Sequence, residues 1–235
     1  MIDPDLAKRA IEAAVAAGAT YADVRVIHKK GEQIAVKNGA VEALSSSTEE
    51  GLGIRVIADG AWGFACTRSN EIEDVEETAR EAVRIARAGA PITTGEVTLD
   101  DTPPARGTWS TKYDVDPFDV PLEDKIDVLM EADKRMRARD RVRVSQGRLV
   151  FMREDKWFYS SEGAEIEQHR TESGGMIAAT AVEGDEVQIR SYPSSLDGFH
   201  AARGWEVVEE IDLPGAADKT AQEACELLEA PLCPS

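Results

Sequence analysis

GLGIRVIADGAWGFACT, residues 51–67, contains two apolar segments separated by Asp59-Gly60. An Asp-Gly pair between apolar residues favours a tight two-residue turn, because both residues adopt positive φ at low cost. The preceding residues 22–47 show the same pattern, with Asn38-Gly39 between two alternating segments and Gly31 interrupting the first. These segments together predict an antiparallel meander.

Helices are predicted on both sides of this meander. The first begins near Pro4, a residue suited to the first helical turn, and ends at Gly18. The second runs from about Asn70 to Ala88, with Asn70 and Glu73 placed as in a capping box. Both segments carry apolar residues at helical spacing, which indicates one buried face on each helix.

The second half of the chain repeats this plan. Pro121 opens a helix, strand-like segments follow up to Tyr192, and a last helix is predicted near Asp218 to Leu228. Turns are predicted at Glu162-Gly163 and Gly184-Asp185. The predicted class is α+β, with antiparallel meander sheets, flanking helices and two helix-meander-helix halves. The predicted parts are a subdomain at 1–90, a connector at 91–119 and a second subdomain at 120–235.

Composition excludes several classes of protein. The 235 residues include 45 acidic and 27 basic side chains, a net charge of -18, which argues against nucleic-acid binding. No apolar run reaches the roughly 20 residues that span a bilayer, and the first residues lack a secretory signal. We therefore expect a cytoplasmic protein without membrane contact. Its three cysteines, Cys66, Cys225 and Cys233, are expected to be reduced, with Cys66 and Cys225 in the core.

The sequence shows no recognisable catalytic site. His28, His169 and His200 lie far apart, and none belongs to an HExxH-like pair on one helix face. Each is expected to be a solvated or hydrogen-bonded strand residue. The run Ser45 to Thr48 lacks a GxSxG context, and the glycine-rich segments match no phosphate loop. No catalytic, cofactor-binding or metal-binding residue is predicted.

Residues 21–88 nevertheless resemble a known family. YADVRV at 21–26, EEGLGIRVIADGAWGFACT at 49–67 and VEETAREAVRIARAG at 75–89 resemble the amino-terminal domain of the TldD/PmbA family, also called modulators of DNA gyrase. The likeness continues more weakly through FYSSEGAEIEQHRT at 158–171, Gly204-Trp205-Glu206 and AQEACELLEAPLCP at 221–234. It covers nearly the whole chain and is closest to the TldD-like members.

The resemblance implies a zinc metallopeptidase whose HExxxH helix and ligand cysteine lie in a carboxy-terminal half. None of those ligands can be placed on this sequence, and Cys233 matches a junction Cys-Pro instead. The chain is thus expected to be the non-catalytic amino-terminal part. It would form substrate-channel walls and subunit contacts for proteolysis of unfolded peptides, and zinc is expected in the missing half.

The expected partners are a TldD/PmbA-type subunit or a separately encoded catalytic half, together with an unfolded peptide substrate. The alternative is a stand-alone binding or assembly module with no peptidase role. Whether the chain belongs to an active enzyme is left open by the sequence.

Overall fold

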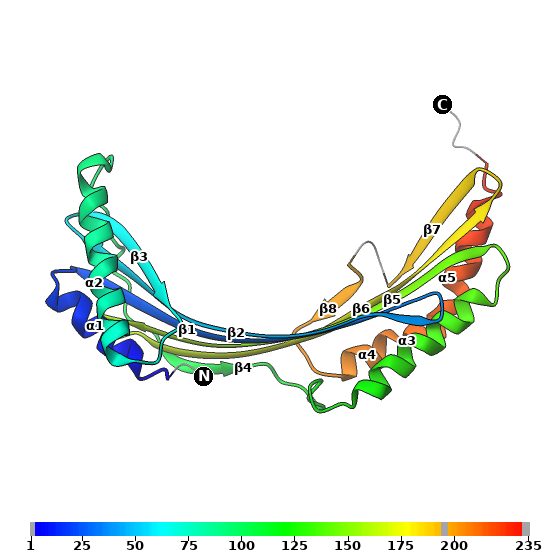
Figure 1. Cartoon of the computed structure of the whole chain (residues 1–235), viewed down its shortest axis with the longest axis horizontal. Helices are drawn as coiled ribbons and strands as arrows, with labels where there is room; N and C mark the ends of the chain where they lie inside the picture. The colour runs from blue at the N-terminus through cyan, green and yellow to red at the C-terminus, as the bar shows by residue number, and fades with distance from the viewer. Residues whose placement is uncertain (1–2, 194–196, 232–235) are drawn as a thin grey trace. The chain divides into compact units, whose positions relative to one another are not determined.

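The computed structural model describes residues 3–193 and 197–231, whose elements group into two compact units. Unit 1 comprises residues 1–30, 48–110 and 154–170, and unit 2 comprises residues 31–47, 111–153 and 171–235. In each unit, helices pack on one face of largely antiparallel strands (Figure 1). The predicted α+β class with meander strands and flanking helices is confirmed.

The described residues form an eight-stranded sheet, in which six strands follow the order β3-β2-β1-β5-β6-β4 and the other two, β7 and β8, pair with β6. Their bounds are β1 Tyr21–Lys37, β2 Ala40–Ala58, β3 Ala61–Thr67, β4 Arg106–Ser110, β5 Val142–Ser160, β6 Glu165–Glu183, β7 Glu186–Tyr192 and β8 Phe199–Ala201. β3 is antiparallel to β2, and β7 and β8 are antiparallel to β6, whereas β4 runs parallel to β6. The strand β4 falls in the segment predicted as a connector.

Two strands are longer than predicted: β1 continues through Gly31 and β2 continues through residues 48–50, where the sequence suggested breaks. Four strands, β1, β2, β5 and β6, contribute residues to both units. Gly31 lies inside β1 in extended conformation, so this glycine does not mark a turn. The true turns carry positive φ, including Asn38-Gly39 at 50° and 79° and Asp59-Gly60 at 50° and 75°. The dipeptide signals for these turns are therefore confirmed.

The helices are α1 Leu6–Ala16, α2 Ile72–Gly89, α3 Leu122–Arg137, α4 Glu206–Ile211 and α5 Leu213–Leu227, with a short 3₁₀ turn at Ala90–Ile92. Gly18, at φ 99°, follows the end of α1 as predicted. The predicted capping box at Asn70 is wrong, because Glu71 occupies the N-cap of α2 and makes no side-chain cap bond. Asn70 instead accepts a hydrogen bond from the backbone nitrogen of Asp3 at 3.2 Å. The sequence did not predict α4.

The core of unit 1 lies between its strands and two helices. α2 packs on β3 and on α1, and the side chains of α2 that face inwards are mostly alanine. Gly63 of β3 lies against the backbone of α2 at Ala82 and Ala86, so the helix approaches the strand closely. Alternate residues of β1 and β2 and the inward face of α2 complete this core, among them Val24, Val26, Ile54, Val56, Val75 and Val83.

The core of unit 2 is built in the same way. α3 packs against α5, and α5 packs against β7. The inward-facing strand residues include Ile34, Leu149, Phe151 and Ile177, all fully buried. Lys125 of α3 is also buried, where it donates to Glu32 and lies 4.8 Å from the ring centre of Phe151. In this unit, the core-facing sides of β1, β5 and β6 are thus buried under helices.

The compact units do not coincide with contiguous halves of the chain. Each of the predicted subdomains, 1–90 and 120–235, contains one hairpin that belongs to the other compact unit. Residues 31–47 pack with unit 2, and residues 154–170 pack with unit 1. The reason is that the long strands carry their hairpin ends into the other unit.

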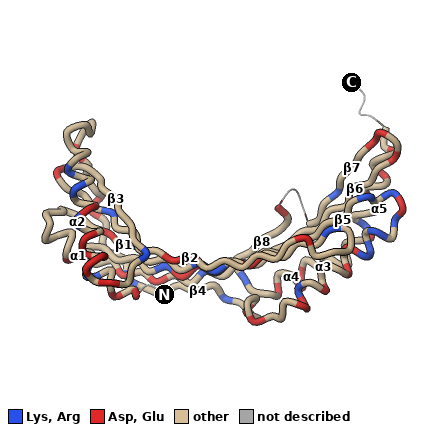
Figure 2. Tube along the Cα trace, viewed as in Figure 1, with Lys and Arg blue, Asp and Glu red and all other residues tan. Residues whose placement is uncertain are grey.

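Charge is spread over both units (Figure 2). Lys and Arg alternate with Asp and Glu on the exposed sides of α2 and α3, where Arg80, Arg84 and Arg135 pair with glutamates of their own helix. Such exposed pairs contribute little to stability each. Across residues 3–193 and 197–231, every helix is too short or too polar to cross a membrane.

Candidate functional site

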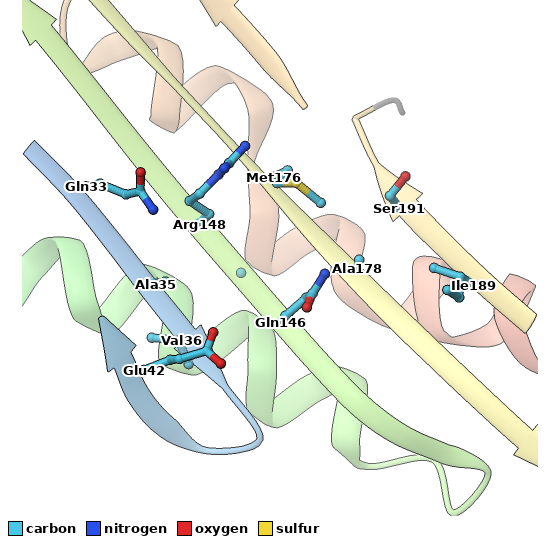
Figure 3. Close-up of a pocket in the computed structure, with 11 residues that line it drawn as sticks. Gln33, Ala35, Val36, Glu42, Gln146, Arg148, Met176, Ala178, Ile189 and Ser191 are labelled. Atoms are coloured by element: carbon cyan, nitrogen blue, oxygen red, sulfur yellow. The ribbon is translucent and has the colours of Figure 1, made fainter. Parts of the chain in front are cut away.

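A groove of about 580 Å³ lies in unit 2, on strands β1, β2, β5, β6 and β7 (Figure 3). Its apolar lining consists of Ala35, Val36, Gly147, Met176, Ala178 and Ile189. Five polar side chains complete it: Gln33, Glu42, Gln146, Arg148 and Ser191. Its volume falls within the range of pockets that take small molecules or short peptide segments.

Strand alternation explains why these residues gather. Successive side chains of a strand point to opposite faces, so Ile34 and Leu149 enter the core while Gln33 and Arg148 face away from the helices. Pairing of β6 with β7 places Ala178 opposite Ser191 and Thr180 opposite Ile189. The residues that line the groove are therefore far apart in sequence, and for this reason no local sequence motif predicted the groove.

The polar groups of the groove suit a peptide backbone. Amide side chains, as in Gln33 and Gln146, can donate to and accept from main-chain groups of any sequence. The two charged residues have partners already, since Arg148 pairs with Asp197 at 2.7 Å and Glu42 with Lys37 at 3.4 Å. Recognition through amides and an apolar surface would be tolerant of sequence.

An open strand edge lies beside these residues in unit 2. β3 pairs with β2 only from Leu52 onwards, and within the described part of the chain no strand pairs with the outer edge of β2 before that residue. Residues 40–47 of β2, which belong to unit 2, are all exposed, including Val41 and Leu44. An unpaired edge offers main-chain donors and acceptors to an added strand. The serines at 45–47, part of the run that lacks a GxSxG context, lie in this segment.

A second polar cluster lies in unit 1 around Trp157. The ring of Trp157 contacts His28 at a centroid distance of 5.1 Å and His169 at 5.9 Å. His169 Nδ1 lies 2.7 Å from Asp155 Oδ1, and its Nε2 lies 2.9 Å from Glu167 Oε1. With an acceptor at each ring nitrogen, the arrangement favours the doubly protonated imidazolium.

The pKa of His169 reflects this environment. Partial burial opposes protonation, but the hydrogen bonds to Asp155 and Glu167 outweigh it and raise the pKa of His169 above its usual 6.5. Glu167 also accepts from Trp157 Nε1 at 3.0 Å, which fixes the carboxylate in place. The cluster is therefore an ion pair network and a set of aromatic contacts.

The described residues do not fit the zinc ion that the family resemblance implies. No three of their His, Cys, Asp or Glu side chains lie where they could share one metal ion. The two carboxylates nearest His169 sit at opposite ring nitrogens, so they do not converge on a common point. The absence of zinc ligands from this chain stays a prediction that metal analysis can test.

Two expectations about single residues are wrong. His28 is neither solvated nor hydrogen-bonded, since it is 7% exposed and its ring nitrogens have no partner among the described residues. Cys66 is exposed instead of buried, because β3 turns Gly63 towards α2 and Cys66 to the other face. Cys225 is half-buried against the core of unit 2. Cys233 lies outside the described residues.

Comparison with known proteins gives two family matches. Residues 22–86 match the model of PmbA/TldA metallopeptidase domain 1, and residues 115–232 match the PmbA/TldA metallopeptidase central domain. Together the two matches cover most of both units. The segment between them contains β4.

Curated relatives are about twice as long as this chain. A metalloprotease of Methanothermobacter thermautotrophicus is 27% identical over 215 residues, covering 92% of this chain and 45% of the relative. Metalloprotease MJ0996 of Methanocaldococcus jannaschii is 25% identical over 220 residues, covering 91% of this chain and 46% of the relative. The chain thus spans about half the length of the curated relatives it matches.

Solved structures share the fold. A modulator of DNA gyrase from Thermotoga maritima aligns with a TM-score of 0.73 and 17% identity, covering 98% of this chain and 50% of that one. TldE from Thermococcus kodakarensis aligns with a TM-score of 0.64 and 16% identity, covering 94% of this chain and 47% of TldE. At this identity the structures speak for the fold alone, whereas the two domain matches carry the assignment: this chain belongs to the PmbA/TldD metallopeptidase family.

Proposed function

We propose that this chain is a non-catalytic amino-terminal part of a PmbA/TldD-type metallopeptidase, which binds unfolded peptide for cleavage by a metal site on another polypeptide segment. The observation that carries the proposal is the groove of unit 2, together with the open edge of β2. Both present backbone-compatible polar groups beside apolar side chains. An extended peptide could add to the strand edge or lie in the groove.

The family assignment supports this proposal. The matched segments are domain 1 and the central domain of a metallopeptidase family, and several curated relatives are named metalloproteases. Within the described residues no metal cluster accompanies the groove. The proposed division of labour places substrate-channel walls and subunit contacts on this chain and chemistry on a TldD/PmbA-type partner or a separately encoded half.

Peptide binding tests the proposal directly. An unfolded polypeptide, reduced and blocked with iodoacetamide, should bind the wild-type chain in calorimetric titration. Ala35→Arg places a large cation in the groove and should weaken binding by about tenfold. Ala16→Arg, on the exposed side of α1, is the matched control and should bind as wild type. No binding by the wild type, or equal binding by both variants, would contradict the proposal.

The competing function is an assembly module without a peptidase role. The exposed apolar residues Trp62 and Phe64 of β3 favour it, since such residues can cover a partner. Mixing the chain with a polypeptide that carries HExxxH separates the two functions. Cleavage of the unfolded peptide that appears only in the mixture supports the peptidase component. A stable complex that never cleaves supports the assembly module.

A further inference from the structure

A second binding surface is built on the strand face of unit 1 that points away from α1 and α2. Ala22, Val24 and Val26 of β1 enter the helix-covered core, so Asp23 and Arg25 point to the other face. The same alternation places Arg55 of β2 there. Register pairs Arg55 with Phe64 and Ile57 with Trp62 on the neighbouring strand.

Asp23 organises two arginines on this face. Its carboxylate is fully buried, Arg25 Nη1 donates to Oδ1 at 2.8 Å, and Arg55 Nε donates to Oδ2 at 2.8 Å. A further contact joins Arg55 Nη2 to the same Oδ2 at 2.7 Å. The arginine side chains are 39% and 40% exposed, so both guanidinium groups reach solvent. Two cations and one anion leave a local charge of about +1 in a strongly acidic protein.

Each of these guanidinium groups lies over an aromatic ring. Arg55 lies 4.5 Å from the ring centre of Trp62, and Arg25 lies 4.9 Å from that of Phe158. Trp62 is held in turn by an edge contact with Tyr21 at 6.0 Å. Burial, followed by the charge of Asp23 and a hydrogen bond to it, raises the pKa of Tyr21 to about 12. The guanidinium groups of Arg25 and Arg55 are thus held by Asp23 and by an aromatic ring each before any ligand binds.

The arrangement exceeds what neutralising Asp23 requires. Two arginines carry about ten N–H donors in total, and among the described residues their bonds to Asp23 engage only a minority. Phe64 lies over Gly53, whose missing side chain leaves it room: a Cβ there would stand 3.2 Å from the ring. An exposed apolar surface therefore adjoins the arginines.

We propose that Arg25 and Arg55 bind a carboxylate of an extended peptide, while Trp62, Phe64 and Phe158 contact its neighbouring side chains. Guanidinium forks match carboxylates with paired hydrogen bonds, and a net charge of one suits a singly charged ligand. This inference rests on the proposed function, in that the ligand is a peptide. The carboxylate is either the free carboxy terminus or an acidic side chain.

Four versions of one unfolded peptide distinguish those sources. The peptide carries either a free or an amidated terminus and either Glu or Gln at one internal position. Calorimetry should show about tenfold weaker binding when the recognised carboxylate is removed. Arg55→Lys keeps the charge but loses the fork, and should weaken only the carboxylate-bearing peptide. Arg84→Gln removes an exposed arginine of α2 and is the matched control.

A small ligand keeps the site testable when peptide binding fails. The Nε–H signals of Arg25 and Arg55 in the wild-type chain should shift with N-acetylphenylalanine and stay in place with its amide. If all four peptides bind alike and these signals do not move, the carboxylate site is wrong while the proposed peptide function stands. If no peptide binds but the signals shift, the proposed function fails and with it the peptide ligand, while carboxylate recognition by Arg25 and Arg55 stands. If no peptide binds in calorimetry and the Nε–H signals do not shift, the proposed carboxylate site is wrong.

Discussion

Asn38 and Ser145 exchange two hydrogen bonds: the backbone nitrogen of Ser145 donates to Asn38 Oδ1 at 2.9 Å, and the backbone nitrogen of Asn38 donates to the Ser145 carbonyl at 3.0 Å. Asn38 occupies the left-handed region at the β1–β2 turn, while Ser145 belongs to β5. The Ser145 hydroxyl also donates to the buried Asp133 of α3. One turn residue thus joins a hairpin, a distant strand and, through Ser145, a helix.

Asn38→Ala should therefore destabilise the chain by about 2 kcal/mol, from the positive φ and the unsatisfied nitrogen of Ser145. Asp59→Ala is the matched control, because Asp59 has the same φ in an equivalent turn and, among the described residues, its side chain makes one long exposed ion pair, to Arg87. It should cost about 1 kcal/mol. Urea unfolding measures both. Equal losses would show that the bond from the Ser145 nitrogen to the Asn38 side chain contributes nothing.

The sequence predicted local features better than long-range ones. Asn38-Gly39 and Asp59-Gly60 identified turns because φ preference is a property of the residues themselves. The sequence did not predict the full length of β1. Gly31 has an extended backbone within the strand, and the residues next to it do not show whether such a glycine lies in a strand or in a turn. Pairing of β1 with β5 depends on residues more than a hundred positions apart.

Site residues escaped prediction for the same reason. Gln33, Arg148 and Met176 line one groove only after three strands align. Asp23 and Arg55 form an ion pair across neighbouring strands, although the alternation of β1 could have placed Asp23 opposite the core. Cys66 was predicted buried from its apolar neighbours, because that prediction ignored which face of β3 the helix covers.

Close approach of β3 to α2 gives a second prediction. A Cβ at Gly63 would stand 2.7 Å from the backbone nitrogen of Ala86 and would also meet the Ala82 carbonyl. Because backbone atoms cannot move aside, Gly63→Ala should destabilise the chain by about 3 kcal/mol. Gly107 of β4 has open space around its Cβ position, so Gly107→Ala should change stability by less than about 0.5 kcal/mol. A tolerated Gly63→Ala in thermal unfolding would contradict this packing.

Metal analysis tests the predicted absence of a zinc site. After incubation with zinc and dialysis, the purified chain should retain substoichiometric zinc by mass spectrometry, and a chelator should not change its thermal unfolding. The physical reason is that His169 already faces a carboxylate at each ring nitrogen, and His28 packs against Trp157. Stoichiometric zinc would overturn the prediction. Alanine variants of His28, His169 and His200 would then show which residue holds the ion.

The pairing of His169 with Asp155 and Glu167 predicts a pH dependence of stability. Partial burial opposes its protonation, but the two hydrogen bonds prevail, so the folded-state pKa lies above the unfolded value of about 6.5. The protonated ring therefore stabilises the fold fully below about pH 6.5, and this contribution is lost as the pH rises through the raised pKa. His169→Gln should remove that decline in the free energy of unfolding above pH 6.5.

Asp155→Asn is the matched test, because it keeps the ring but removes the stronger partner. It should lower the pKa of His169 in an NMR titration and shift the decline in stability towards lower pH. If His169→Gln leaves the slope of stability against pH unchanged, the ion pairs at Trp157 do not couple to folding. The raised pKa would then arise equally in the unfolded chain.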